Sequence, residues 1–111
     1  MDKFLALGEP TRRKIMELLA GSGNLAASEI YSKFESTPPA ISQHLKVLRD
    51  ADLVRVEKRA QKRIYYINQE PMRELEKWIK RFTQDVQAQH DRLETLLQER
   101  MGKIENKKEK Q

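Results

Sequence analysis

The chain has 111 residues, of which 22 are basic and 17 acidic, so its net charge is +5 and its isoelectric point lies near 9.6. This length fits one domain, and the positive excess favours a polyanionic partner, either nucleic acid or an anionic membrane surface. Because the chain contains no cysteine, disulfides, thiol catalysis and iron–sulfur clusters are excluded. No apolar run approaches the roughly 20 residues of a membrane span, and the N-terminus does not read as a signal peptide. We expect a cytoplasmic protein. A helix that lies on an anionic membrane surface is an alternative to nucleic-acid binding, but the net charge of −1 over residues 67–101 argues against it, so we expect no membrane contact.

Two short helices are predicted in the first third of the chain. The segment PTRRKIMELLA has its apolar residues at helical spacing, and Pro10 suits the first turn, where its missing N–H is not needed. The segment GSGN ends this helix in a turn. The segment LAASEIYSKF then carries an apolar stripe of the same spacing around Ile30, which predicts a second, short helix.

A third helix is predicted in PPAISQHLKVLRDA. Ser36 or Thr37 can cap its N-terminus, and both prolines fall in the first turn, where backbone N–H groups have no helical partner. At about 100° per residue, one narrow face becomes the core side of the helix. That face consists of Ile41, Leu45 and Leu48. The opposite side carries Pro39, Gln43 and Lys46, with Ser42 on one flank and His44 on the other, nearer the core edge.

A β-hairpin is predicted next, because LVRVEK and RIYYIN are rich in β-branched and aromatic residues. The connecting RAQK contains no Gly, Asn or Asp, so we expect a longer, mobile loop in place of a tight two-residue turn. At least one of Tyr65 and Tyr66 should pack on the core. Between Ser36 and Tyr66 there are seven basic and three acidic residues, so most of the positive excess lies in this segment.

One long helix is predicted from Pro71 to Ile104, because apolar residues recur there at intervals of three and four. It would be about 51 Å long, and a domain of this size cannot cover such a stripe alone. We therefore interpret the stripe as a helix-pairing seam of a homodimer, with Trp78 in core or dimer packing. The seam consists of Leu75, Ile79, Phe82, Val86, Leu93 and Leu97. The polar tail, residues 105–111, is expected to be disordered.

The order of elements predicts a function. Two short helices joined by a tight break, the second with polar residues outward, describe a helix-turn-helix, and the hairpin behind it is placed to act as a wing. Small and hydrogen-bonding side chains suit the major groove, and basic wing residues suit phosphates. The sequence therefore predicts a mainly α fold with a small β-hairpin: a winged helix-turn-helix over residues 1–70 that binds double-stranded DNA, followed by a dimerisation helix over residues 71–104.

Two other classes of function were weighed against DNA binding. The first is a protein-interaction module that uses the winged helix for docking and has negligible affinity for DNA. The second is an enzyme, but Ser42, His44 and Asp50 diverge on one rigid helix and nothing suggests an oxyanion donor, so we expect no catalysis.

The segments PTRRKIMELL, PPAISQHLKVLRDADLV and KRIYYIN resemble the ArsR-type winged-helix repressors of bacteria, over roughly residues 5 to 70. The resemblance implies a homodimer, paired through its first and last helices, that represses transcription from a palindromic operator. Phe4 and Leu5 would then join the dimer contact. The DNA-facing residues, combining the resemblance with the outward face of the helix, are Thr37, Pro38, Pro39, Ser42, Gln43, His44 and Lys46, with Arg59, Lys62 and Arg63 on the wing.

The chain departs from the metal-sensing members of that family. Where many carry a Cys-x-Cys metal box, this sequence has Ala26, Ala27 and Ser28. Where others bind zinc through two histidines of the last helix, it has only His90. We therefore expect no metal and no cofactor. The sequence does not name an inducer, which leaves a small molecule, another protein or none.

Overall fold

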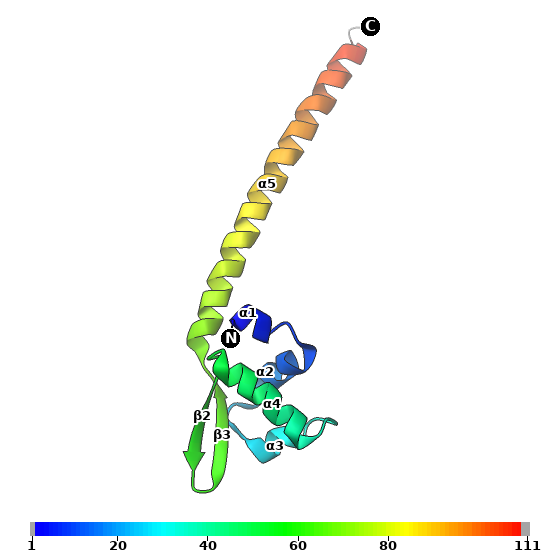
Figure 1. Ribbon diagram of the computed structural model, residues 1–111. Helices are drawn as coiled ribbons and strands as arrows, with labels where there is room; N and C mark the ends of the chain where they lie inside the picture. Colours follow the sequence, from blue (N-terminus) through cyan, green and yellow to red (C-terminus); the bar gives the residue numbers. More distant parts are fainter. Residues whose placement is uncertain (1, 110–111) are drawn as a thin grey trace. The chain divides into compact units, whose positions relative to one another are not determined.

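The computed structural model describes residues 2–109, and side chains as far as residue 102. Five helices and three strands follow one another in these residues (Figure 1). Their bounds in chain order are α1 (Lys3–Ala6), α2 (Pro10–Ser22), β1 (Leu25–Ala26), α3 (Ala27–Tyr31), α4 (Pro38–Asp50), β2 (Val54–Arg59), β3 (Lys62–Ile67) and α5 (Gln69–Glu109). They form two compact units, the first ending at Arg73 and the second beginning at Glu74.

Local chemistry sets the ends of α2. Pro10 occupies its first position, as predicted, and the carboxylate of Glu9 caps the helix by accepting a hydrogen bond of 2.9 Å from the Arg12 N–H. The helix ends at Gly23, whose φ of +78° lies in the region that glycine adopts without strain. The turn predicted from GSGN is therefore confirmed, with α2 running two residues, Gly21 and Ser22, into that segment.

The core of the first unit forms where α4 packs against its neighbours. The predicted core face of α4 is confirmed, since Ile41, Leu45 and Leu48 are all buried. The helix lies against α1, α2 and β2. The other large side chains that are fully buried are Ile15, Leu19, Ile30, Leu53 and Val54. Both helices of the predicted helix-turn-helix thus contribute to one core, with α4 fixed along its apolar side.

The hairpin belongs to a three-stranded antiparallel sheet in the order β1-β3-β2. The strand β1 was not predicted, because two residues are too few for an alternating pattern to be visible. It pairs Leu25 with Tyr65 and Ala26 with Ile64. Tyr65 is buried, which confirms that one of the two tyrosines packs on the core.

The predicted long loop at the hairpin tip is wrong. Arg59 pairs directly with Lys62, so only Ala60 and Gln61 form the turn. Ala60 adopts a φ of +56°, a conformation that costs a non-glycine residue about 1–2 kcal/mol. The six-residue ladder on either side of the turn holds this conformation in place, although the sequence carries none of the usual turn residues.

The helix α5 is longer than predicted. It begins at Gln69 and runs to Glu109, so the expected end at Ile104 is too early, and residues 105–109 of the expected disordered tail are helical. The tail is rich in Lys and Glu, which are good helix formers, and Gly102 lies inside the helix at tolerable cost. Residues 110–111 lie outside the described residues. In the part of the chain that the structure describes, no helix combines the length and apolar character needed to cross a membrane.

Candidate nucleic-acid interface

The outward face of α4 carries the predicted groove-facing residues. Thr37 caps the helix, its hydroxyl accepting a hydrogen bond of 3.3 Å from the Ala40 N–H, and the two prolines follow in the first turn. Because the opposite face is buried, this side is left to solvent. The exposed members are Thr37, Pro38, Pro39, Ser42, Gln43 and Lys46. Six of the seven residues predicted on this helix and its cap are therefore accessible to a ligand.

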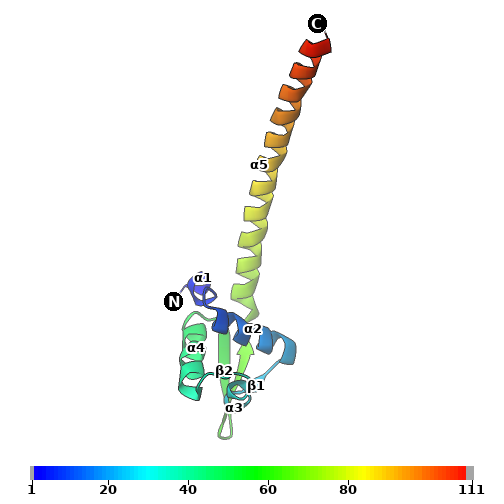
Figure 2. The ribbon, with the colours of Figure 1, turned by 90° about the vertical axis from the view of Figure 1, so that its right-hand side faces the viewer.

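The hairpin turn carries the predicted basic residues. Arg59, Lys62 and Arg63 are exposed, and the first two form the last pair of the ladder. Glu57 lies 3.5 Å from the guanidinium of Arg59 and partly offsets its charge. In both views the turn, α3 and the N-terminal end of α4 lie towards the same end of the first unit (Figures 1 and 2). The N-terminal end of α4 and the basic turn therefore lie at the same end of the first unit.

His44 differs from the other predicted contacts, because its side chain is only 25% exposed and is held from α2. Its Nδ1 lies 3.5 Å from Nη1 of Arg12 and 3.7 Å from Oε2 of Glu9. Desolvation by burial alone would raise the pKa of Glu9. Backbone hydrogen bonds from Arg12 and Thr11, together with His44, outweigh this effect and lower the pKa of Glu9 from its ordinary value. His44 therefore joins α4 to the N-terminus of α2.

Sequence reasoning missed the contacts of α2 with α1. Arg12 donates from Nε to the carbonyl of Ala6 at 2.6 Å, and Arg13 donates from Nη1 to the carbonyl of Leu7 at 2.8 Å. These carbonyls lie at the C-terminal end of α1, where helical partners are lacking. The pair of adjacent arginines, Arg12 and Arg13, was the available signal in the sequence. They fix α1, which carries the predicted dimer residues Phe4 and Leu5, both exposed.

The second unit presents an apolar seam along α5. The predicted seam residues are exposed, with Leu75 as the exception: it is only 6% exposed and thus a core residue of the chain, not part of an open face. Trp78 stacks on Phe82 with ring centroids 5.3 Å apart. The exposed seam consists of Ile79, Phe82, Val86, Leu93 and Leu97. Leu96 and Met101, which the sequence reading left out, are also exposed apolar residues of this helix.

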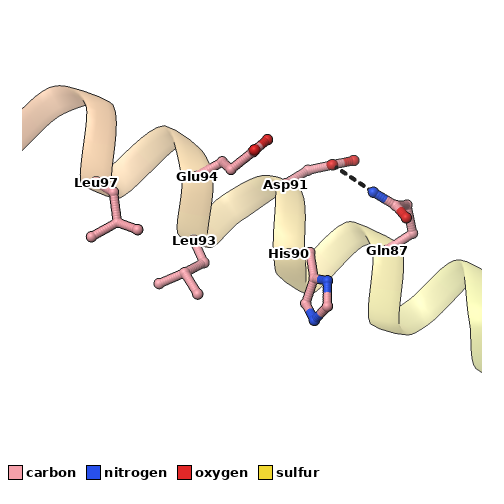
Figure 3. A pocket seen from close by; sticks show the side chains of 6 residues that line it. All are labelled: Gln87, His90, Asp91, Leu93, Glu94 and Leu97. Atoms are coloured by element: carbon pink, nitrogen blue, oxygen red, sulfur yellow. Dashed lines mark hydrogen bonds between the residues drawn. The ribbon is translucent and has the colours of Figure 1, made fainter.

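A hollow of about 310 Å³ lies on α5 around His90. Figure 3 shows the His90 ring on the same side of the helix as Leu93 and Leu97, whereas Gln87, Asp91 and Glu94 lie along another side. Gln87 donates a hydrogen bond of 3.0 Å to Asp91, one turn further along. A hollow between side chains three and four residues apart is the kind of space that receives a side chain of a second helix. Among the described side chains, no three of His, Asp or Glu lie close enough to share a metal ion.

Comparison with known proteins supports this reading of the fold. Residues 9–56 match the family described as "Bacterial regulatory protein, arsR family". The chain is 34% identical to the transcriptional repressor SdpR of Bacillus subtilis over 79 residues, covering 71% of this chain and 87% of that protein. The crystal structure of a possible transcriptional regulator for arsenical resistance is 33% identical, with a TM-score of 0.67 over 74% of this chain and 84% of that one. An ArsR-like regulator from Rhodococcus sp. RHA1, 22% identical, shares the fold with a TM-score of 0.71 over 84% and 87%.

Proposed function

Because the chain belongs to the arsR family of bacterial regulatory proteins and is a DNA-binding transcriptional regulator, we propose that it acts as a homodimeric repressor on a palindromic operator. In this proposal the protein has no enzymatic activity and responds to no metal. The observation that carries the DNA contact is the division of α4 into a buried face and an exposed polar face. Such a helix enters the major groove with its polar side, while its apolar side keeps it fixed to the domain.

The residues have different roles in this proposal. Gln43 and Ser42 reach base edges, because an amide and a hydroxyl both donate and accept hydrogen bonds. The small first turn, with Pro38 and Pro39, allows a close approach to the groove. Lys46 and the wing residues neutralise phosphates and supply affinity that does not depend on sequence. The wing residues are Arg59, Lys62 and Arg63.

The seam on α5 supports the proposed homodimer. Ile79, His90 and Met101 recur every 11 residues, as do Phe82 with Leu93 and Val86 with Leu97. A repeat of 11 residues keeps a stripe nearly straight along an α-helix, so two copies can meet along most of its length. These side chains are about half exposed in the single chain, and burying them in a second copy gains roughly 25 cal/mol per Å² of apolar surface.

The test begins with DNA fragments of the source genome selected by the purified protein. A two-fold dimer should select pseudo-palindromes whose half-sites are spaced by about 10 base pairs or a multiple. Binding to the selected fragment should exceed binding to random DNA at physiological salt by at least about a thousandfold. Equal affinity for the two would reject sequence-specific repression, and no measurable affinity for either, at low or high salt, would leave the protein-docking module.

Two variants separate base reading from phosphate binding on that fragment. Gln43→Ala should relax the preference at one position of each half-site, where a good contact contributes about 1–3 kcal/mol of discrimination. Lys62→Ala should weaken operator and random DNA alike and flatten the salt dependence. Fluorescence anisotropy with operator, single-base variants and random duplex, each at several salt concentrations, measures both effects. The proposed roles are wrong if the two variants behave alike.

A further inference from the structure

We infer that His44 faces the DNA as a hydrogen-bond donor through Nε2, and that Arg12 fixes this polarity as a positioning residue that touches no base. The inference rests on the proposed function in one respect, namely that α4 lies in the major groove. It assigns to His44 a base preference and to Arg12 an effect on specificity, both of which follow from the contacts of one imidazole nitrogen.

The first step concerns the neutral imidazole. Nη1 of Arg12 lies 3.5 Å from Nδ1 of His44, in a geometry that directs an N–H of the guanidinium at this nitrogen. A guanidinium has donors only and does not lose its proton in proteins, so Nδ1 must be the acceptor. In a neutral imidazole one nitrogen accepts and the other carries the proton. The contact with Arg12 therefore selects the tautomer with the proton on Nε2.

The second step concerns the protonated imidazole. When the ring takes up a proton, Nδ1 becomes a donor, and Oε2 of Glu9 lies 3.7 Å away to accept from it. Glu9 and Arg12 are the charged groups that contact the ring from α2. Nε2 carries a hydrogen in the charged form as well. Nε2 is thus a donor in both protonation states, and an acceptor in neither.

The third step is the access of Nε2. This nitrogen makes no hydrogen bond to a described residue, and no buried side-chain nitrogen or oxygen among the described residues lacks a partner. Nε2 therefore reaches solvent. Its position on the flank of α4, next to the exposed Gln43, puts it beside the face proposed to read the groove.

A fixed donor has a defined partner in the major groove. Guanine offers acceptors at N7 and O6, adenine at N7 and thymine at O4, whereas cytosine offers only the donor N4 amino group. The base facing His44 should therefore be any base other than cytosine. If Arg12 no longer donates to Nδ1, the ring can place its proton on Nδ1 towards Glu9, and Nε2 then becomes an acceptor that admits cytosine.

The first measurement uses the free protein and does not depend on DNA binding. Nitrogen-15 NMR of the His44 ring, at a pH where it is neutral, should report the Nε2–H tautomer in the wild type. Arg12→Met should shift the ring towards the Nδ1–H tautomer. Arg13→Met is the matched control, because Arg13 bonds the neighbouring carbonyl of α1 but not His44, and it should leave the tautomer unchanged. A wild-type ring in the Nδ1–H form overturns the inference, even if Arg12→Met fails to fold.

The second measurement reads the base preference. His44→Ala first identifies the operator position that loses its preference, and the four base pairs are then compared there. The wild type should disfavour cytosine by about tenfold, the lower range of a good base contact. Arg12→Met should reduce this ratio to about twofold, while Arg13→Met keeps it. A preference for cytosine in the wild type, or a His44→Ala variant with unchanged preferences, overturns the base-reading role. If the wild type binds no DNA sequence specifically, the proposed function is overturned instead.

Discussion

The two units of the chain differ in the exposure of their apolar side chains. In the unit that ends at Arg73, the predicted core face of α4 and its neighbours are buried to within a few per cent. In the unit that begins at Glu74, a single helix leaves large apolar residues open along one stripe. The first unit thus buries its apolar side chains in a core of its own. An isolated helix such as that of the second unit is only marginally stable in water. Its apolar seam is therefore stabilised most when a second helix packs against it.

The polar contacts differ in the same way. In the first unit, His44 contacts Glu9 and Arg12, which lie far from it in the sequence. These contacts therefore exist only in the folded domain. In the second unit, Lys80 with Glu76 and Gln87 with Asp91 pair one turn apart on one helix. Such exposed pairs contribute a few tenths of a kcal/mol each and support helix formation, not tertiary structure.

The largest expected difference between the two units is in the free energy of unfolding when a leucine of each is replaced by alanine. Leu48→Ala removes a fully buried side chain and should lower the free energy of unfolding by about 2–5 kcal/mol at any protein concentration. Leu97→Ala, at a side chain that is 51% exposed, should change it by less than about 0.5 kcal/mol in dilute protein. Urea unfolding at two protein concentrations measures both. A loss at Leu97 as large as that at Leu48 in dilute protein would mean that the seam is already covered within one chain.

A charge in the seam should dissociate the homodimer. Leu93→Glu places a carboxylate on each copy in an apolar contact and should raise the dissociation constant of the dimer by about 100-fold. The control is Gln84→Glu, which adds the same charge on the far side of α5 and should leave the dimer intact. Sedimentation equilibrium measures the constant, and operator binding should weaken in parallel. Equal effects of the two variants would point to net charge and not to the seam.

The turn of the hairpin offers a smaller effect of opposite sign. Ala60→Gly removes the strain of a positive φ and should stabilise the first unit by about 1 kcal/mol. Gln61→Gly, at the neighbouring turn position without a positive φ, should destabilise it by about 0.5 kcal/mol through chain entropy. Thermal unfolding followed by circular dichroism distinguishes the two. A destabilising Ala60→Gly would contradict the two-residue turn.

The contrast between the units also explains what the sequence could predict. Periodic features were predictable: the core face of α4, the two long strands and the stripe of α5 each repeat at the spacing of their own element. Features that depend on distant residues were not. The turn at Ala60 is set by the ladder around it, β1 exists only because β3 lies beside it, and the position of His44 depends on Glu9 and Arg12. Among the predicted interface residues on α4, the exposed ones followed from helical spacing, whereas the position of His44, which tertiary contacts hold, remained ambiguous.

The smallest expected effect concerns Glu9. Its carboxylate contacts His44, a residue far away in the sequence, and the pairs described in the second unit include no such tertiary contact. The folded-state pKa of Glu9 is lowered, so this carboxylate stabilises the fold fully above its unfolded pKa of about 4.5 and loses that contribution as the pH falls through the lower folded value. Glu9→Gln removes the titration but keeps an acceptor for the Arg12 N–H. The variant should therefore be less stable than the wild type near neutral pH, and the difference should shrink as the pH falls from about 6 to about 3.

Urea unfolding of both proteins across this pH range measures that difference directly. Other carboxylates titrate in the same range, but they do so in both proteins and cancel when the two curves are subtracted. A difference that grows on acidification would have the sign of a raised pKa, and would mean that desolvation outweighs the backbone hydrogen bonds at this cap.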